Sequence, residues 1–400
     1  MKLPASNIAL ATTIAMMAIP ASAQEEESNM VKMCLMFETP SGHARSDPIL
    51  NQECAADHVH TFYGPQNIHP RTNNGDLRDT APNFSSSPWV ENQSLYWHPS
   101  IYEVSTTDDG QKQYSLVSRL DTSAYYRWDN TVEPRTEAFP PNFRMIAFSN
   151  QEGADRQGDI GGSLLVECCQ VLGPGEDDES CTTAMNSMVF PKERCDFLGI
   201  GFAMPTCWDA SKGDGREDPI GHMTYTTNGA VNGPCPDGYR RLPQVQLLSR
   251  IYDYRGDIHD YVLSNEADHY HVDFMNGWRG LGGILDRCQP TGEDGYHPPC
   301  GCTQFMTPTA NPAEIACEED VKEHILDEEI TEVVGALPRG TCEGADVIPK
   351  SWDLDPPFAA SGSCGNNNNN DNDNDNNDNN DNDDNNDNNN DNNDDNNNDN

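Results

Sequence analysis

Fourteen cysteines constrain this 400-residue chain more than any other feature, because they bear on both the compartment in which it folds and the links within it. All of them lie downstream of Gln24, and their even number suits complete pairing in an oxidising environment. A structural zinc site is the competing explanation, but the chain has no C-x2-C pair. The adjacent Cys168 and Cys169 suit two separate bridges, so we predict disulfides whose connectivity the sequence leaves open.

The amino terminus indicates the same compartment. An early lysine, an apolar run at residues 8–19 and small residues at 21–23 have the form of a secretory signal that is cleaved before Gln24. The run is shorter than the ~20 apolar residues of a membrane span, and no other stretch approaches that length. We therefore expect residues 1–23 to be a signal peptide and the remaining protein to be secreted and extracellular.

Acidic residues outnumber basic ones by 66 to 24, which gives a formal net charge of −42. Residues 366–400 consist only of asparagine and aspartate, and without their 12 aspartates the charge is still −30. Such a body disfavours nucleic acid and anionic membranes as partners, because both bind cationic surfaces. The tail has no apolar residue to bury, so we expect it to be disordered and dispensable for folding.

Between the signal and the tail, the sequence is typical of β structure. Short segments rich in branched and aromatic residues, such as QYSLVSRL, FRMIAFS and LPQVQLLSRIYDY, are separated by clusters of Gly, Pro, Asn and Asp. This pattern predicts a mainly β domain, a sandwich or jelly roll with long loops, over residues 24–288. Residues 289–365 are predicted to form a disulfide-stapled extension with one helix at about 311–337, where Asn311 and Pro312 suit its first turn.

Closely spaced histidines are the main candidates for chemistry. His58 and His60 of ADHVHTFYG are two positions apart, and YHVDFMNGW places His271 two positions before Asp273. Residues at i and i+2 of a strand share a face, so each pair would present its side chains together. With His222 of PIGHMTY, these residues form a ligand set suited to Zn, Cu, Mn or non-haem Fe. We predict that the five converge on a divalent metal, although H-x-H spacing also occurs among histidines that are only hydrogen-bonded.

Other motif residues have both functional and structural interpretations. Asp209 could serve as a general acid or base, or could cap a turn. Arg144, and Arg45 beside Asp47, could orient a substrate carboxylate or brace loops. Three aromatic residues could stack on sugar rings, but aromatic residues in motifs with Pro and Gly more often pack in the core, so packing is favoured. These are Trp97, Trp208 and Trp278.

The motifs together resemble a known family. RSDPIL, DHVHTFYG, AFPPNFRMIA, MPTCWDA, IGHMTY and YHVDFMNGW occur in the order seen in the secreted, often fungal family catalogued as domain of unknown function nineteen ninety-six, over about residues 45–288. Members are sometimes joined to sugar-binding modules, and no settled activity comes with the name. The resemblance implies that five positions recur in the family motif. They are His58, His60, His222, His271 and Asp273.

The chain departs from the family pattern at two places, and one neighbouring histidine falls outside it. His269 does not belong to the motif, which makes His271 and Asp273 the better candidates. Members often have serine where this chain has Asp57, which affects the hydrogen bonding around the H-x-H segment. They also often have a close cysteine pair where this chain has FSSSPWVENQS, which changes the disulfide scheme.

Two functional classes remain open. The first is a secreted metal-dependent enzyme that acts on extracellular polysaccharide or a similar polymer by hydrolysis or oxidation, with Asp209 and Asp273 as candidate catalytic carboxylates. The second is a non-catalytic cell-wall-associated or carbohydrate-binding protein whose histidines are structural. No Walker loop, dinucleotide fingerprint, G-x-S-x-G elbow or H-E-x-x-H helix indicates another chemistry. The substrate, the metal and the oligomeric state are not determined by the sequence.

Overall fold

The computed structural model describes residues 30–66, 68–80, 84–129, 131–158, 162–171, 179–267, 269–288, 302–309 and 328–340, with Gly344 and Val347. The predicted signal peptide, most of the predicted 289–365 extension and the Asn/Asp tail lie outside these residues. No helix in the described part is long and apolar enough to cross a membrane.

Short antiparallel strands make up most of the described chain. In chain order they are β1 (Met30–Phe37), β2 (Gly42–Ala44), β3 (His60–Tyr63), β4 (Leu95–Pro99), β5 (Ile101–Thr106), β6 (Lys112–Leu116), β7 (Leu120–Asp129), β8 (Arg144–Phe148), β9 (Leu164–Val171), β10 (Glu179–Met185), β11 (Arg194–Ala203), β12 (Cys207–Trp208), β13 (Met223–Thr224), β14 (Arg240–Arg241), β15 (Gln244–Arg255), β16 (Asp260–Leu263), β17 (His271–Met275) and β18 (Glu332–Val334). The helices are α2 (Asn74–Asp79), α3 (Gln151–Gln157) and α4 (Leu281–Arg287), with 3-10 turns η2 (Ala210–Lys212) and η3 (Thr303–Phe305).

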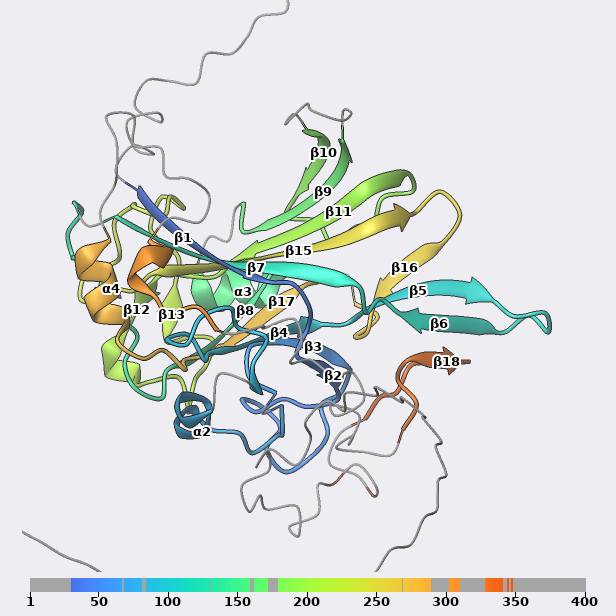
Figure 1. The fold of residues 1–400 in the computed structure, drawn as a ribbon, viewed down its shortest axis with the longest axis horizontal. Coiled ribbons are helices and arrows are strands. Elements are labelled where there is room, and N and C mark those ends of the chain that lie inside the picture. The colour runs from blue at the N-terminus through green and yellow to red at the C-terminus, as the bar shows by residue number, and fades with distance from the viewer. Residues whose placement is uncertain are drawn as a thin grey trace, which may run out of the picture. The chain divides into compact units, whose positions relative to one another are not determined.

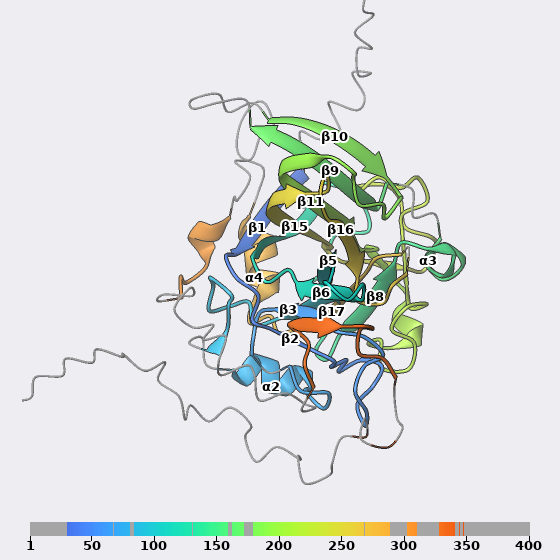
Figure 2. The ribbon, with the colours of Figure 1, turned by 90° about the vertical axis from the view of Figure 1, so that its right-hand side faces the viewer.

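Two antiparallel sheets face each other across the main core (Figure 1). One has six strands in the order β1-β7-β15-β11-β9-β10, and the other has five in the order β2-β3-β4-β17-β8. Figure 2 shows the six-stranded sheet lying over the five-stranded one. The prediction of a mainly β fold is confirmed. Because β17 lies between β4 and β8, segments that are far apart in sequence become neighbours in the second sheet.

Strand alternation explains how the facing sheets bury their core. Every second residue of β1 is fully buried, whereas Met36 between two of them is 50% exposed. The inner face of the five-stranded sheet supplies partners such as Tyr96 and Phe274, whose rings lie 5.4 Å apart. Each large apolar side chain buried in this way stabilises the fold by roughly 1.5–3 kcal/mol. The buried β1 residues are Val31, Met33, Leu35 and Phe37.

The outer face of the five-stranded sheet is divided between apolar and polar residues. One part carries a smaller hydrophobic cluster that includes Phe62, Trp97 and Met275. The other part carries buried polar side chains, among them His60 and Asp273. Directly opposed residues of antiparallel strands share a face, and the register pairs Phe62 with Trp97 and Trp97 with Asp273. The apolar cluster and the polar group are therefore continuous on one surface.

Helix α2 packs beside this outer face. The Asn73 side chain accepts hydrogen bonds from the backbone N–H groups of Gly75 and Asp76, and the Asp76 carboxylate in turn accepts one from the Asn73 N–H. This capping box explains why so short a segment is helical. Leu77 is buried in the smaller hydrophobic cluster, and the Asn74 side chain donates to the carbonyl oxygens of Phe143 and Asn276, so an apolar contact, a cap and buried hydrogen bonds anchor the helix.

Strand β18 corrects part of the predicted helix at 311–337. Residues 311–327 lie outside the described part, but Glu332–Val334 is a strand that pairs with β6 in a sheet ordered β16-β5-β6-β18. Ile330 and Val333 are buried as predicted, yet in extended chain beside tyrosines of β5 and β6. The apolar spacing fits either structure, and the β-branched run Ile-Thr-Glu-Val-Val favours the strand once an edge is available for pairing.

Disulfides are formed as the cysteine count predicts. No cysteine in the described residues is free, and ten are disulfide-bonded. The neighbours Cys168 and Cys169 project to opposite sides of β9 and bond to Cys195 of β11 and Cys181 of β10. Cys207 pairs with Cys235, and Cys288 with Cys302. The expectation of separate bridges for the adjacent cysteines is confirmed.

The disulfide pairing is testable by peptide mapping without reduction. Mass spectrometry should recover Cys168 linked to Cys195 and Cys169 linked to Cys181. A Cys168→Ala/Cys195→Ala variant should lose roughly 3–4 kcal/mol of unfolding free energy, since the bridge closes a loop of 27 residues. Recovery of a Cys168–Cys181 peptide would contradict the strand register of β9, β10 and β11.

Candidate metal centre

Strands β3 and β17 flank β4 and bring distant histidines together. His60 begins β3, His271 begins β17, and His58 lies just before β3. Each of the three histidines has a ring nitrogen that lies within 4.8 Å of a ring nitrogen of each of the other two. The His58 and His60 rings are 4.3 Å apart, and those of His60 and His271 are 5.5 Å apart. The three histidines form what we call the histidine cluster.

A backbone contact fixes the orientation of the His60 ring. Its Nδ1 lies 2.8 Å from the carbonyl oxygen of Ser46, which can only accept a hydrogen bond. The proton is therefore on Nδ1, and Nε2 presents a lone pair. That Nε2 lies 3.3 Å from Nε2 of His271. Two nitrogens bound to one tetrahedral zinc at about 2.0–2.1 Å would be separated by about 3.3 Å, so the spacing suits two ligands of a shared metal.

Several buried nitrogen and oxygen atoms around the cluster lack hydrogen-bond partners within the described chain. They are Nε2 of His58, Nδ1 of His271 and Oδ2 of Asp273. The Asp273 oxygen lies 3.6 Å from Nε2 of His271, beyond normal hydrogen-bond distance. Each buried polar atom left unpaired costs about 1–3 kcal/mol. A divalent cation bound at Nε2 of His60 and His271 would also give a partner to Nε2 of His58 and to the Asp273 carboxylate, so the donor set fits a metal.

Burial keeps the imidazoles of the cluster neutral, which is the form that binds metals. Burial, together with the nearby positive charge of Arg339, lowers the pKa of His58 to about 3. Burial and then the neighbouring histidines hold the pKa values of His60 and His271 well below their usual range. Burial, followed by the proximity of Asp47, raises the pKa of Asp273 well above its usual range.

The cluster is more open on one side than on the others. His60 and Asp273 are each 1% exposed and His271 is 6% exposed. His58 is the half-buried member. Phe148 covers His271, with its ring 5.2 Å away, and His269 lies farther out, 6.4 Å from His271. Access from solvent is therefore from the side of His58.

Residues 328–340 are held close to that open side by two ion pairs. Arg45, which is buried, donates to Glu328 at 2.7 Å and to the carbonyl oxygen of Gly340 at 2.7 Å. Asp57 lies 3.5 Å from the guanidinium of Arg339 and accepts a hydrogen bond from the Gly340 N–H. Asp57, which stands where family members often have serine, thus pairs with residues 339 and 340, which lie beyond the region that resembles the family. Arg45 braces this segment.

Two of the predicted site residues lie outside the cluster. His222 is fully buried beside Phe143, with ring centroids 5.2 Å apart. Its ring also lies against Gly215, where φ is +90° and a Cβ would come within 2.8 Å of the imidazole. Asp209 is the cap of η2 and accepts hydrogen bonds from the Ser211 N–H and hydroxyl, which lower its pKa. The structure therefore brings together His58, His60 and His271 with Asp273 beside them, and places His222 and Asp209 elsewhere.

The three motif tryptophans are buried, as their packing interpretation predicts. Trp97 is fully buried, and Trp208 and Trp278 are 7% and 5% exposed. The FSSSPWVENQS segment is held by hydrogen bonds instead of the cysteine pair of the family pattern. The Gly64 N–H donates to the Ser86 hydroxyl, and the Gly277 N–H donates to the Ser94 hydroxyl.

Sequence reasoning missed the contribution of the Ser46–Asp47 turn. The Ser46 carbonyl orients His60, and Asp47 is 5% exposed and accepts from the N–H groups of Ile49 and Leu50. Burial raises the pKa of Asp47 to about 6. The Asp-Pro dipeptide was a visible turn signal, but nothing in the local sequence connects it with histidines further along the chain.

Comparison with known proteins identifies one similarity. The family model described as "Domain of unknown function (DUF1996)" matches residues 47–278, which is more than half of the chain. No curated protein and no solved structure gives a significant match. The matched region contains the histidine cluster and ends at Trp278, so residues 328–340 lie beyond it.

Stability should fall in mild acid because of three buried histidines outside the cluster. Burial lowers the pKa values of His43, His98 and His222 to about 4, from 6.5 for an ordinary histidine. Between these values the unfolded chain binds more protons, so stability rises with pH and is lost as pH falls from about 6.5 towards 4. Asp47 and Asp273, whose pKa values burial raises, oppose this, but they are fewer than the buried histidines. Urea unfolding should give a lower midpoint at about pH 4.5 than at about pH 7; a higher midpoint in acid would contradict the burial of neutral imidazoles.

Replacement of the buried Arg45 should cost more unfolding free energy than replacement of an exposed arginine whose ion pair has the same nitrogen–oxygen distance. Arg45–Glu328 and Arg135–Asp286 are both 2.7 Å pairs, but the arginine side chains are 2% and 57% exposed. Arg45→Met should cost about 2–4 kcal/mol of unfolding free energy, since it strands buried acceptors. Arg135→Met should cost no more than about 1 kcal/mol. Equal losses in chemical denaturation would show that Arg45 does not brace residues 328–340.

Proposed function

The chain belongs to the DUF1996 family, and from this premise we propose that it is a secreted protein that holds a divalent metal and acts on extracellular polysaccharide or a similar polymer. The metal, such as Zn, Cu or Mn, would be held by His58, His60 and His271, with Asp273 as a fourth donor. The observation that carries the proposal is the convergence of three imidazoles within 4.8 Å. The disulfide-bonded cysteines support an extracellular location.

The protein's own residues prepare this site for metal-dependent chemistry. The His60 Nδ1–H bond to Ser46 fixes the tautomer and aims Nε2 at the centre of the cluster. Burial raises the pKa of Asp273, so this carboxyl can hold a proton at Oδ2. It would release the proton when a cation binds near His271, whose Nε2 lies 3.6 Å from Oδ2. When bound, a divalent metal supplies a Lewis acid that polarises a substrate oxygen or activates a water molecule. The half-buried His58 marks the side from which a polymer would approach.

Burial of the donors supports a second candidate, in which the metal is structural in a wall-associated or carbohydrate-binding protein. His60, His271 and Asp273 are at most 6% exposed. Structural sites are closed, whereas catalytic sites keep an open position. In this alternative the metal would join the segment before β3 to β17 and take no part in turnover. The half-buried His58 is the feature that favours the catalytic form.

Metal analysis of the purified protein tests the proposal directly. Wild-type protein should contain about one equivalent of a divalent metal, and His58→Ala and His271→Ala should contain almost none because each removes a donor. His259→Gln is the matched control, since His259 pairs with Glu103 and lies outside the cluster. Wild-type protein that stays metal-free after exposure to Zn, Cu and Mn would refute the metal site.

Chelation then separates the two candidate functions. Loss of turnover on a glycan panel with little change in melting temperature would support the catalytic site. A large drop in melting temperature with no turnover before or after chelation would support the structural alternative.

A further inference from the structure

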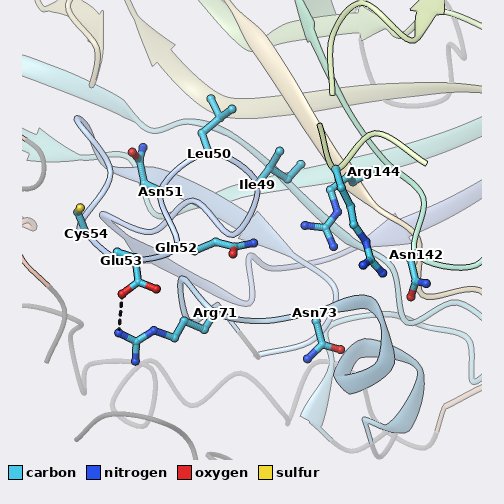
Figure 3. Close-up of a pocket in the computed structure, with 11 residues that line it drawn as sticks. Ile49, Leu50, Asn51, Gln52, Glu53, Cys54, Arg71, Asn73, Asn142 and Arg144 are labelled. Carbon is cyan, nitrogen blue, oxygen red and sulfur yellow. Dashed lines mark hydrogen bonds and ion pairs between the residues drawn. The ribbon is translucent and has the colours of Figure 1, made fainter. Parts of the chain in front are cut away.

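A cavity of about 720 Å³ lies next to the Ser46–Asp47 turn and is lined by basic side chains. Figure 3 shows Arg144 and Asn142 on one side and Arg71 with Glu53 on the other. Arg216 also lines the cavity, and Glu53 is the one carboxylate among the lining residues. The chain has only 24 basic residues against 66 acidic ones, so three arginines around one cavity depart sharply from its average charge. We call it the Arg144 pocket.

Arg144 itself is a buried cation that lacks a carboxylate partner in the described chain. It is 6% exposed, and its Nη2 donates to the side-chain oxygen of Asn74 at 2.9 Å. Its Nε is buried and has no hydrogen-bond partner among the described residues. A buried guanidinium without a paired carboxylate is costly, because burial removes its hydration and the more distant Asp214 compensates only in part. The geometry therefore leaves a charge and a donor available to an oxyanion.

Arg216 is presented by a loop that the fold holds firmly in place. The Arg144 N–H donates to the carbonyl oxygen of Asp214 at 3.0 Å, and the Trp208 indole N–H donates to the carbonyl oxygen of Gly213 at 2.8 Å. His222 packs beneath Gly215, the position that only glycine fits. Arg216 is partly neutralised by Asp214, with its Nε 3.4 Å from the carboxylate. His222 and Trp208 thus position this loop beside Arg144.

The Arg144 pocket and the histidine cluster are on the same sheet face. The register pairs Met275 with Arg144 and His271 with Phe148, so Arg144 and His271 are separated by four residues along the strands. At about 3.4 Å per residue this corresponds to roughly 14 Å. The chain that leaves Asp47 at the cluster continues through Ile49 to Cys54 along the wall of the pocket. The residues between them on this face, such as Asp273 and Met275, are at most 1% exposed, so a polymer that reaches both places follows the surface around them.

We propose that the Arg144 pocket binds an oxyanion group carried by an acidic glycan, either the carboxylate of a uronic acid residue or a sulfate ester. Guanidinium groups match both oxyanions through paired N–H donors, and the amide of Asn142 adds a donor among the lining residues. Oxyanion binding stands on the pocket alone. Its assignment as a subsite that places polymer beside the histidine cluster rests on the proposed function.

Calorimetric titration with defined oligosaccharides tests the pocket. The probes are an oligogalacturonide, a sulfated oligosaccharide of equal length, a neutral oligosaccharide and inorganic sulfate. Arg216→Gln should weaken binding of the preferred acidic oligosaccharide roughly tenfold or more, because it removes a charged donor. Arg194→Gln should change it less than about twofold; its side chain is 59% exposed beside Asp253, against 57% for Arg216 beside Asp214, but it lies outside the pocket.

Each result decides the proposal. Preference for the uronate or the sulfated probe identifies which oxyanion the pocket takes. Equal weakening by the two arginine variants, equal binding of the neutral oligosaccharide, or binding of inorganic sulfate alone would overturn it. Arg144→Gln should abolish binding of the acidic oligosaccharide if this variant folds. If it does not fold, the result with Arg216→Gln tests the proposal.

Titration of the metal-deficient His271→Ala variant separates the pocket from the metal site. Retained binding of the acidic oligosaccharide would show that the pocket works without the metal. If wild-type protein bound the acidic oligosaccharide but no metal, the proposed function would fail while the pocket stood. Metal binding without oligosaccharide binding would reject the pocket and leave the metal site.

Discussion

Antiparallel pairing of β17 with β4 and β8 is the constraint on which both candidate sites depend. One face of this five-residue strand packs Val272 and Phe274 into the main core. The other face carries His271 and Asp273 and, through its register with β8, sets Arg144 further along the same surface. A slip of one residue would exchange the two faces and put ionisable groups into the main core, so burial of the apolar side fixes the chemistry of the polar side.

The buried polar groups on this face reduce the stability of the folded protein unless a ligand pairs with them. Neutral imidazoles, a carboxyl with a raised pKa and a guanidinium without a carboxylate partner in the described chain are buried on β3, β17 and β8 of one sheet. Folded proteins satisfy almost all such groups, and exceptions concentrate where a ligand completes the bonding. The histidine cluster has the donors for a cation, and the Arg144 pocket has the donors for an anion. A cation site and an anion site that are separated by roughly 14 Å along the strands suit an acidic polymer that reaches both.

Sequence reasoning predicted the features that depend on local periodicity. Alternation predicted the β fold, and the H-x-H and H-x-D spacings predicted that each pair would share a strand face. The resemblance to the family tied the two segments together, and the structure confirms that His58, His60 and His271 form one group. His222 is different, because a histidine in a loop carries no periodic signal for the face it will join, and it supports the loop of Arg216 instead. The predicted helix was wrong over residues 328–337, since its apolar spacing suits either element and pairing with β6 decided the outcome. Arg216 has no sequence signal, because it becomes significant only when Gly215 brings it beside Arg144.

X-ray absorption spectroscopy of the metal-loaded wild-type protein is the most direct measurement of the histidine cluster. Three imidazoles and one carboxylate around zinc would give nitrogen and oxygen scatterers at about 2.0–2.1 Å, with the outer-shell pattern of several histidine rings. Loss of part of that pattern in His60→Ala would place His60 among the ligands. A spectrum that fits only oxygen ligands, without imidazole scattering, would show that the metal lies elsewhere and that the buried histidines are structural.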